Sequence, residues 1–149
     1  MRRYQIEVTE ETTADPATVY ALLREGKTWP EWGPLDSFEL EREGEGEPEG
    51  IGAVRILRRG RVTGRDTIVA FSPNRGFSYT HKGLPVRDYR GDIELTPTDG
   101  GGTSIRWRVS YRSLIPGTGG LLVKGLTGFI HELTAGLATY AAKKAGFVG

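Results

Sequence analysis

Side chains able to carry out acid–base chemistry are concentrated in the middle of the chain. His81 continues the alternation of Phe77 and Tyr79, so we expect its imidazole to point to the same face as those two rings. Asp66 falls at an inward position of the preceding strand pattern, where an unpaired carboxylate would be costly to bury. An imidazole titrates near neutral pH, so these groups could move protons on a bound molecule. With Tyr89 they predict a polar patch on an apolar face, and Asp66, His81 and Tyr79 are the candidate catalytic residues.

Two simpler interpretations of the same residues stay open. A histidine at such a position more often lies at the rim of the core and hydrogen-bonds to backbone. A β-bulge near Gly64 would turn Asp66 toward solvent and separate it from His81. The patch could also anchor a ligand through hydrogen bonds without any reaction.

Other kinds of reactive site are disfavoured by the sequence. The chain has no cysteine, which excludes disulfides, thiolate nucleophiles and cysteine metal sites. His131 and Glu132 are followed by Ala135 where a zinc motif would need a second histidine, so we predict no metal and no other cofactor. The glycine-rich segment 117–120 lacks the lysine and hydroxyl residue of a phosphate-binding loop. It reads as a hinge or cap more readily than as an anion cradle.

These residues must be positioned by a mostly antiparallel sheet. Residues 3–12 alternate as a strand, and Asp15-Pro16 predicts the start of a helix that ends near Gly26. A second short helix is expected around residues 28–32. From residue 36 onward the period of two returns for about 75 residues, interrupted by turns at hairpin spacing. This order predicts a meander of consecutive strands.

The last part of the chain has helical periodicity instead. Its apolar residues recur in steps of three and four and trace one face of a helix of about 25 residues. They are Leu122, Leu126, Phe129, Leu133, Leu137 and Tyr140. We therefore predict an α+β domain over residues 1–149, in which a curved sheet of about seven strands wraps a long C-terminal helix, with two short helices between strands 1 and 2.

Composition limits the class of protein. Hydrophobic residues make up 37% and charged residues 26%, as in a globular domain. Apolar runs are too short to cross a bilayer and the N-terminus has no signal core, so a cytoplasmic location is expected. The sequence does not indicate an oligomeric state.

Charge is distributed unevenly along the chain. Residues 1–50 carry 13 acidic and 5 basic side chains, whereas residues 51–112 carry 5 acidic and 12 basic ones. We expect these charges to pair across neighbouring strands, in preference to forming a nucleic-acid surface. The densest basic group, expected to face Glu39, Glu41 and Glu43, comprises Arg55, Arg58, Arg59, Arg61 and Arg65.

The wide aromatic residues on the inward face predict space between sheet and helix. A curved sheet lined by such rings is difficult to fill evenly, although a fully packed core is the alternative. Ligand pockets of this kind are mostly apolar with a few convergent polar groups. The residues predicted to line the pocket are Trp32, Val54, Ile56, Ile68, Phe77, Tyr79, Tyr89, Ile93, Trp107, Val109, Tyr111, Leu126, Phe129, Ile130 and Leu133.

Several motifs in this order resemble a known family. Residues 14–23 (ADPATVYALL) are followed by Trp29-Pro30-Glu31-Trp32, and residues 68–79 read IVAFSPNRGFSY. With residues 101–105 and the closing helix, the chain is similar to the START-related (SRPBCC) superfamily, in its polyketide cyclase/dehydrase-like branch. The resemblance implies a helix-grip fold with a hydrophobic pocket for lipids, sterols, polyketides or other apolar molecules. The alternative fold is the nuclear-transport-factor-like cone. In that fold the chain ends in strands, whereas this sequence predicts a C-terminal helix.

Three functions are compatible with this sequence. The favoured one is binding of a small hydrophobic or aromatic molecule, lipid-like or polyketide-like, in a cavity between sheet and helix. The second is a polyketide cyclase/dehydratase-like enzyme that uses acid–base side chains in the same pocket. The third is a protein-interaction module whose concave face or hairpins bind another protein. The resemblance supplies the pocket and no catalytic set.

Overall fold

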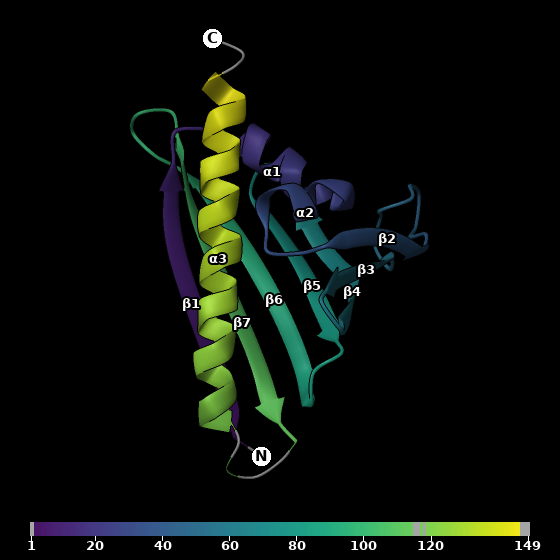
Figure 1. Ribbon diagram of the computed structural model, residues 1–149. Helices are drawn as coiled ribbons and strands as arrows, with labels where there is room; N and C mark the ends of the chain where they lie inside the picture. The colour runs from purple at the N-terminus through teal and green to yellow at the C-terminus, as the bar shows by residue number, and fades with distance from the viewer. Residues whose placement is uncertain (1, 115–116, 118, 147–149) are drawn as a thin grey trace.

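The computed structural model describes residues 2–114, 117 and 119–146, and it shows the predicted α+β architecture (Figure 1). The elements in chain order are β1 (Arg3–Thr12), α1 (Pro16–Arg24), the 3₁₀ turn η1 (Gly26–Thr28), α2 (Trp29–Trp32), β2 (Ser37–Arg42), β3 (Val54–Arg59), β4 (Val62–Ser72), β5 (Gly76–Lys82), β6 (Val86–Pro97), β7 (Thr103–Ser113) and α3 (Gly119–Gly146).

The strands form a seven-stranded sheet in the order β1-β7-β6-β5-β4-β3-β2, with all neighbours antiparallel. Consecutive strands from β2 to β7 are joined by hairpins, and β1 closes on β7 at the far edge. Asn74 and Gly60 adopt positive φ angles of 62° and 58° in two of these turns, a conformation that asparagine and glycine tolerate best. The predicted meander is therefore confirmed.

The register of β4 decides where Asp66 points. The pairing with β5 is regular from Arg65 to Ile68, and the register shifts only between Ile68 and Ala70. No bulge therefore falls near Gly64, and Asp66 keeps its inward parity. It is 6% exposed.

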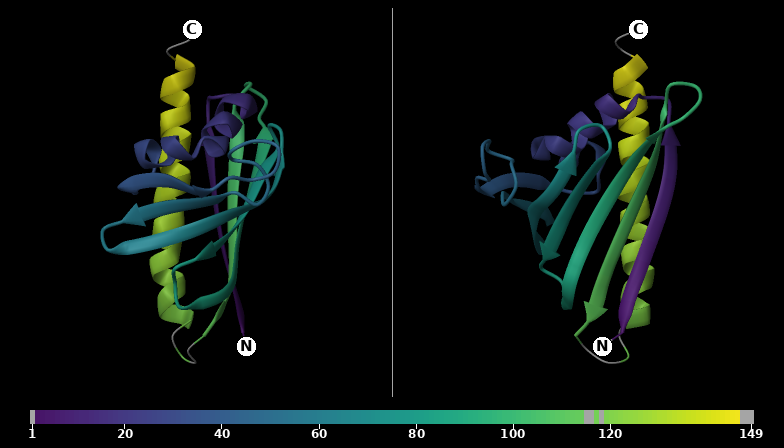
Figure 2. Two further views of the ribbon diagram at one scale, coloured as in Figure 1. Left: turned by 90° about the vertical axis from the view of Figure 1, so that its right-hand side faces the viewer. Right: turned by 180° about the vertical axis from the view of Figure 1, so that it is seen from behind.

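The first and last helices begin and pack as their sequences suggest. Asp15 caps α1 by accepting a hydrogen bond from the Thr18 amide at 2.9 Å, and Pro16 follows at the first turn. The 28-residue α3 lies along the concave face and contacts β1, β7, α1 and α2 (Figures 1 and 2). Gly136 brings α3 against the backbone of Trp32, since a Cβ atom there would overlap the Trp32 carbonyl oxygen. Among the described residues, no helix combines the length and apolar character that a membrane span requires.

One expected parity is wrong. Arg55 is paired with Leu40 and Asp66 on the inner face, and Leu57 with Gly64, whereas Val54 and Ile56 lie on the opposite face. Alternation alone made the arginine look like the solvent-exposed member of the strand. Arg55 is instead 1% exposed, because its terminal N–H groups donate to backbone carbonyls and a carboxylate lies beside its guanidinium inside the fold.

Ion pairs between different strands cover the outer face of the sheet. Arg58 lies 3.3 Å from Glu39 and Arg65 lies 3.1 Å from Glu41, as the charge distribution predicted. Further pairs join Arg106 to Glu7, Arg108 to Glu94 and Arg112 to Asp88. These exposed pairs contribute little stability individually, about 0–1 kcal/mol each.

Candidate functional site

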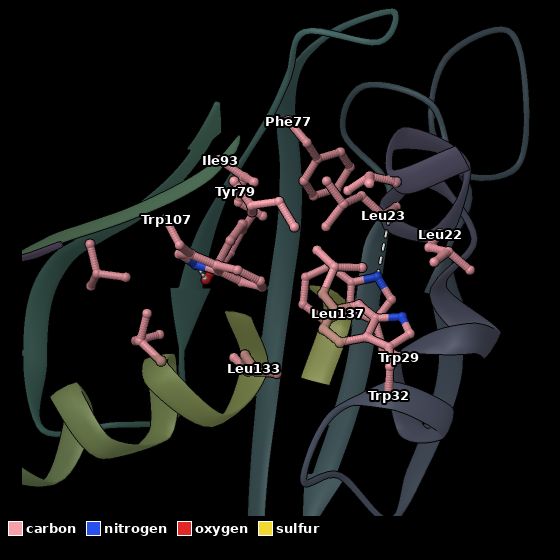
Figure 3. Packing of buried hydrophobic residues seen from close by; sticks show 14 of the residues in the cluster. Leu22, Leu23, Trp29, Trp32, Phe77, Tyr79, Ile93, Trp107, Leu133 and Leu137 are labelled. Atoms are coloured by element: carbon pink, nitrogen blue, oxygen red, sulfur yellow. Dashed lines mark hydrogen bonds between the residues drawn. The ribbon is translucent and has the colours of Figure 1, made fainter. Parts of the chain in front are cut away.

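One end of the space between sheet and α3 is filled by indole rings (Figure 3). The ring centroids of Trp29 and Trp32 are 4.9 Å apart, and Trp107 lies 5.7 Å from Trp29 in an edge-on arrangement. The indole nitrogen of Trp29 donates to the Leu23 carbonyl at 3.1 Å, and Trp32 donates to the Thr28 hydroxyl at 3.1 Å. Both donors are thus satisfied although the rings are buried. The short helices α1 and α2 hold these rings in place.

The other end of the same space contains a pocket of about 200 Å³. It lies between β3, β4, β5 and β6 on one side and the N-terminal half of α3 on the other. This volume exceeds the ~150 Å³ of an apolar cavity that holds benzene, and it is below the ~300 Å³ of most pockets for larger ligands. The lining residues are Trp29, Leu35, Leu57, Arg59, Val62, Gly64, Asp66, Tyr79, His81, Leu84, Tyr89, Leu126, Phe129 and Leu133.

An aspartate–histidine pair forms part of the pocket wall. Asp66 and His81 are directly opposite each other on β4 and β5, and Nδ1 of His81 lies 2.6 Å from Oδ1 of Asp66. When Nδ1 donates its proton to the carboxylate, Nε2 is left without a proton and can accept one. Gly64 makes room for the ring, because a Cβ atom there would lie 2.6 Å from the Cε1 atom of His81.

Two buried tyrosines continue this polar patch. The His81 and Tyr89 ring centroids are 4.8 Å apart, and those of Tyr79 and Tyr89 are 6.5 Å apart. The Tyr79 hydroxyl accepts a hydrogen bond from the Trp107 indole at 3.1 Å (Figure 3). Burial raises the pKa of both tyrosines, and the Asp66 charge raises them further. Both hydroxyls therefore stay protonated at neutral pH and can donate hydrogen bonds.

A buried arginine lies beneath the patch on β3. Arg55 donates to the carbonyl oxygens of Leu23 and Arg24 at 3.0 and 2.6 Å, which occupies free acceptors at the end of α1. Its Nε atom is 2.8 Å from Glu49 in the β2–β3 loop. Burial lowers the pKa of Arg55, and the charges of Glu49 and Asp66 oppose that shift. Arg55 thereby joins α1, the β2–β3 loop and the inner face of the sheet.

The mouth of the pocket combines apolar surface with one cation. Val62 is 51% exposed, and Leu84 and Phe129 are half-buried. The guanidinium carbon of Arg59 lies 5.4 Å from the centroid of the Phe129 ring, within cation–π distance. A ligand entering here would pass an apolar rim beside this arginine.

The predicted site residues divide into three groups. The pocket is lined by Tyr79, Tyr89, Leu126, Phe129 and Leu133, together with the candidate acid–base residues Asp66 and His81. The core outside the pocket contains Trp32, Ile68, Phe77, Ile93, Trp107, Val109, Tyr111 and Ile130. Val54 and Ile56 lie on the outer face. The structure thus brings the proposed polar patch together and places much of the expected apolar lining in the packed core.

Several lining residues were not predicted. Leu57 and Arg59 lie on the same face of β3 as Arg55. They would have been predicted if Arg55, and not Val54, had been assigned to the inner face. Gly64 faces an aromatic ring on the next strand, and a glycine inside an alternating strand often marks such a close approach. Leu35 and Leu84 come from loops, for which periodicity gives no signal.

Metal and anion sites gain no support from the described residues. No group of three or more His, Cys, Asp or Glu side chains within residues 2–114, 117 and 119–146 could hold a metal ion. His131 is exposed and lies 3.8 Å from Glu10. The predicted hinge or anion-binding turn at 117–120 includes Thr118, which lies outside the described residues.

Comparison with solved structures shows the same fold in proteins of low sequence identity. A START superfamily protein from Mycobacterium smegmatis is 14% identical with a TM-score of 0.76, covering 93% of this chain and 97% of its own. Ara h 8.0201 is 18% identical with a TM-score of 0.74, covering 95% and 99%. A protein from Nitrosospira multiformis is 20% identical with a TM-score of 0.75, covering 95% and 99%. These likenesses establish the helix-grip fold.

Sequence comparison places the chain in a family. No protein with a curated description matches it significantly. Residues 3–142, nearly the whole chain, match the profile described as "Polyketide cyclase / dehydrase and lipid transport". The order of motifs, the seven-stranded sheet and the gripped helix agree with that match. The chain therefore belongs to the polyketide cyclase/dehydrase and lipid transport family of the START-related superfamily.

Proposed function

We propose that this protein binds a small hydrophobic or aromatic molecule in the pocket between the sheet and α3. The observation that carries the proposal is the pocket of about 200 Å³, whose wall is mostly leucine and aromatic side chains. A few polar groups converge on it from β4, β5 and β6. Apolar walls supply affinity by desolvation, and polar groups fix the ligand's orientation.

The pocket volume limits the class of ligand. One or two rings, or a short branched chain, would fit the space without rearrangement. A sterol or a long acyl chain would require α3 to move away from β4 and β5. Lipid-like ligands are therefore expected to be short, and compact aromatic compounds are the better candidates.

Filling the pocket tests this proposal. Leu126 lines the pocket and is 7% exposed, whereas Leu121 on the same helix is 80% exposed. Leu126→Trp should abolish binding of compounds selected from a one- and two-ring library by NMR, and Leu121→Trp should leave their affinity unchanged. Native mass spectrometry of freshly purified protein should show a retained small molecule only where the pocket is open. Equal binding by both variants would place the ligand elsewhere.

An acid–base reaction on the ligand is a second candidate, favoured by the Asp66–His81 contact of 2.6 Å. With Nδ1–H donated to Asp66, Nε2 of His81 could take a proton from carbon next to a ligand carbonyl. The electron pair left behind would form an enolate, whose oxygen a neutral tyrosine hydroxyl could stabilise. Expulsion of a β-hydroxyl group as water would then be a dehydration, and attack on a second carbonyl a cyclisation.

Two substitutions separate binding from catalysis. Asp66→Asn and His81→Ala should reduce turnover of an enolisable ligand by about 10²-fold or more if His81 is the base. Ligand affinity, measured by calorimetry, should change far less. Unchanged turnover in both variants would remove these residues from any mechanism and leave the binding function.

A further inference from the structure

Arg59 differs from Arg55, Arg58 and Arg65 of the β3–β4 hairpin, which have acidic partners. Arg58 and Arg65 pair with acidic residues on the outer face, and Arg55 is buried against Glu49. Within the part of the chain that the structure describes, no carboxylate lies at ion-pair distance from Arg59. It shares the inner-face parity of Arg55 and Leu57, so its stem lies along the pocket and its charge is at the mouth.

The Phe129 ring lies beside this guanidinium at the mouth of the pocket. The 5.4 Å separation between the guanidinium carbon and the ring centroid is within cation–π distance. Arg59 is exposed at this point, so its guanidinium N–H groups can hydrogen-bond to a ligand at the mouth. Two of them match the two oxygens of a carboxylate.

The opposite charge lies deeper in the same pocket. Asp66 is the one carboxylate among the described residues that line it, and it is paired with His81. On the ladder, Arg59 pairs with Val62 and Asp66 pairs with Arg55, a separation of four residues along each strand or roughly 13 Å. An anionic group would therefore be repelled at the inner end and attracted at the mouth.

We propose that Arg59 selects ligands carrying a carboxylate, with the acid group held at the mouth and a compact apolar body inside. This inference rests on the proposed binding function and adds a substrate class to it. The pocket volume of about 200 Å³ restricts the body to one or two rings or a short branched chain. Arg59 acts as a specificity-determining residue.

Matched pairs of acids and amides test this assignment. One- and two-ring aromatic carboxylates, beginning with benzoate and 2-naphthoate, are titrated beside their primary amides by calorimetry and NMR. The acids should bind about tenfold more tightly than the amides, as expected for a charge-assisted hydrogen bond that is partly exposed to water. Arg59→Gln should remove that difference and leave amide affinity within about twofold. Arg59→Lys should recover only part of it, because an ammonium group lacks the planar fork.

A neighbouring arginine provides the control. Arg61 is exposed in the same hairpin and does not line the pocket, so Arg61→Gln should preserve the preference for acids. Equal affinities for acid and amide, or equal weakening of both by Arg59→Gln, would overturn the role of Arg59 while leaving the pocket as a binding site. If no pair binds the unmodified protein, both the proposed function and this inference are wrong.

Discussion

The two ends of the space between the sheet and α3 are both lined by apolar and aromatic side chains, but one end is packed and the other contains a pocket. At one end, α2 supplies Trp29 and Trp32, whose rings pack against Trp107 in the buried core. At the other end, Leu126, Phe129 and Leu133 of α3 face β3–β6, with Trp29 and Leu35 at the border, and a pocket remains. The presence of covering helices, more than the hydrophobicity of the sheet, decides which end is filled.

The polar groups at the two ends are also satisfied differently. At the filled end, the indole nitrogens of Trp29 and Trp32 donate to acceptors on α1 and η1. At the pocket end, Asp66 and His81 are paired with each other and still line open space. The filled end therefore stabilises the fold, and the pocket end retains polar groups that can hydrogen-bond to a ligand.

Truncation of Trp107 should produce the largest effect. It is fully buried and donates to the Tyr79 hydroxyl, so Trp107→Ala removes packing and leaves an indole-sized void. We expect a loss of about 4–5 kcal/mol in the free energy of unfolding, measured by urea denaturation. Leu126→Ala, which enlarges an existing pocket, should cost nearer about 2 kcal/mol. Equal losses would mean that the two ends are packed alike.

Replacement of Arg55 should have the next largest effect. Arg55→Met removes the donors to the Leu23 and Arg24 carbonyls and leaves Glu49 half-buried without its partner. We expect a loss of about 3 kcal/mol by the same measurement. The exposed pair of Arg58 and Glu39 is the control, and Arg58→Met should cost less than about 1 kcal/mol. A stable Arg55→Met variant would show that α1 does not depend on this connection.

Arg55 also marks where sequence reasoning fails. Periodicity predicted the order of elements, the gripped helix and the convergence of Asp66, His81, Tyr79 and Tyr89, because alternation and turn residues are local signals. Periodicity placed Val54 and Ile56 on the inner face of β3, which is wrong, because a charged residue inside a strand pattern is assumed to face water. The carbonyls that accept from Arg55 lie about 30 residues earlier in the chain, and no local pattern reveals such a partner.

The extent of the pocket was equally beyond a local pattern. Phe77, Tyr79, Tyr89 and Trp107 were all candidates for the lining. Phe77 and Trp107 belong to the packed core outside the pocket, whereas Tyr79 and Tyr89 line the pocket. The difference depends on where α1 and α2 lie over the sheet. That position follows from long-range packing, including the close approach of Gly136 to Trp32.

Substitution of Gly64 tests the pocket end directly. A Cβ atom at this position would lie 2.6 Å from His81, so Gly64→Ala should displace the imidazole and weaken its contact with Asp66. We expect a loss of about 2 kcal/mol and a clear change in the His81 ring signals in NMR spectra. Gly100→Ala is the matched control, because a Cβ atom there would meet nothing within 4 Å. Unchanged His81 signals would show that the ring is not held against the strand.

Removal of the α1 cap should have the smallest effect, and it acts on the filled end. Asp15 accepts from the Thr18 amide at 2.9 Å, and this hydrogen bond lowers the pKa of the Asp15 carboxyl. Asp15→Ala should cost about 1 kcal/mol at pH 7, measured by urea denaturation. Because the folded-state pKa is lowered, the charged cap stabilises the fold above the unfolded pKa of about 3.9, and this contribution is lost as pH falls through the folded value.

The pH dependence distinguishes a charged cap from a neutral one. The stability gap between the unmodified protein and Asp15→Ala should narrow from pH 5 toward pH 3, whereas Asp15→Ser, which caps without charge, should show no such trend relative to Asp15→Ala. A gap that stays constant over this range would mean that the carboxylate charge adds nothing to the cap. Affinity for a pocket ligand should stay the same in both variants at pH 7, because no residue of α1 lines the pocket.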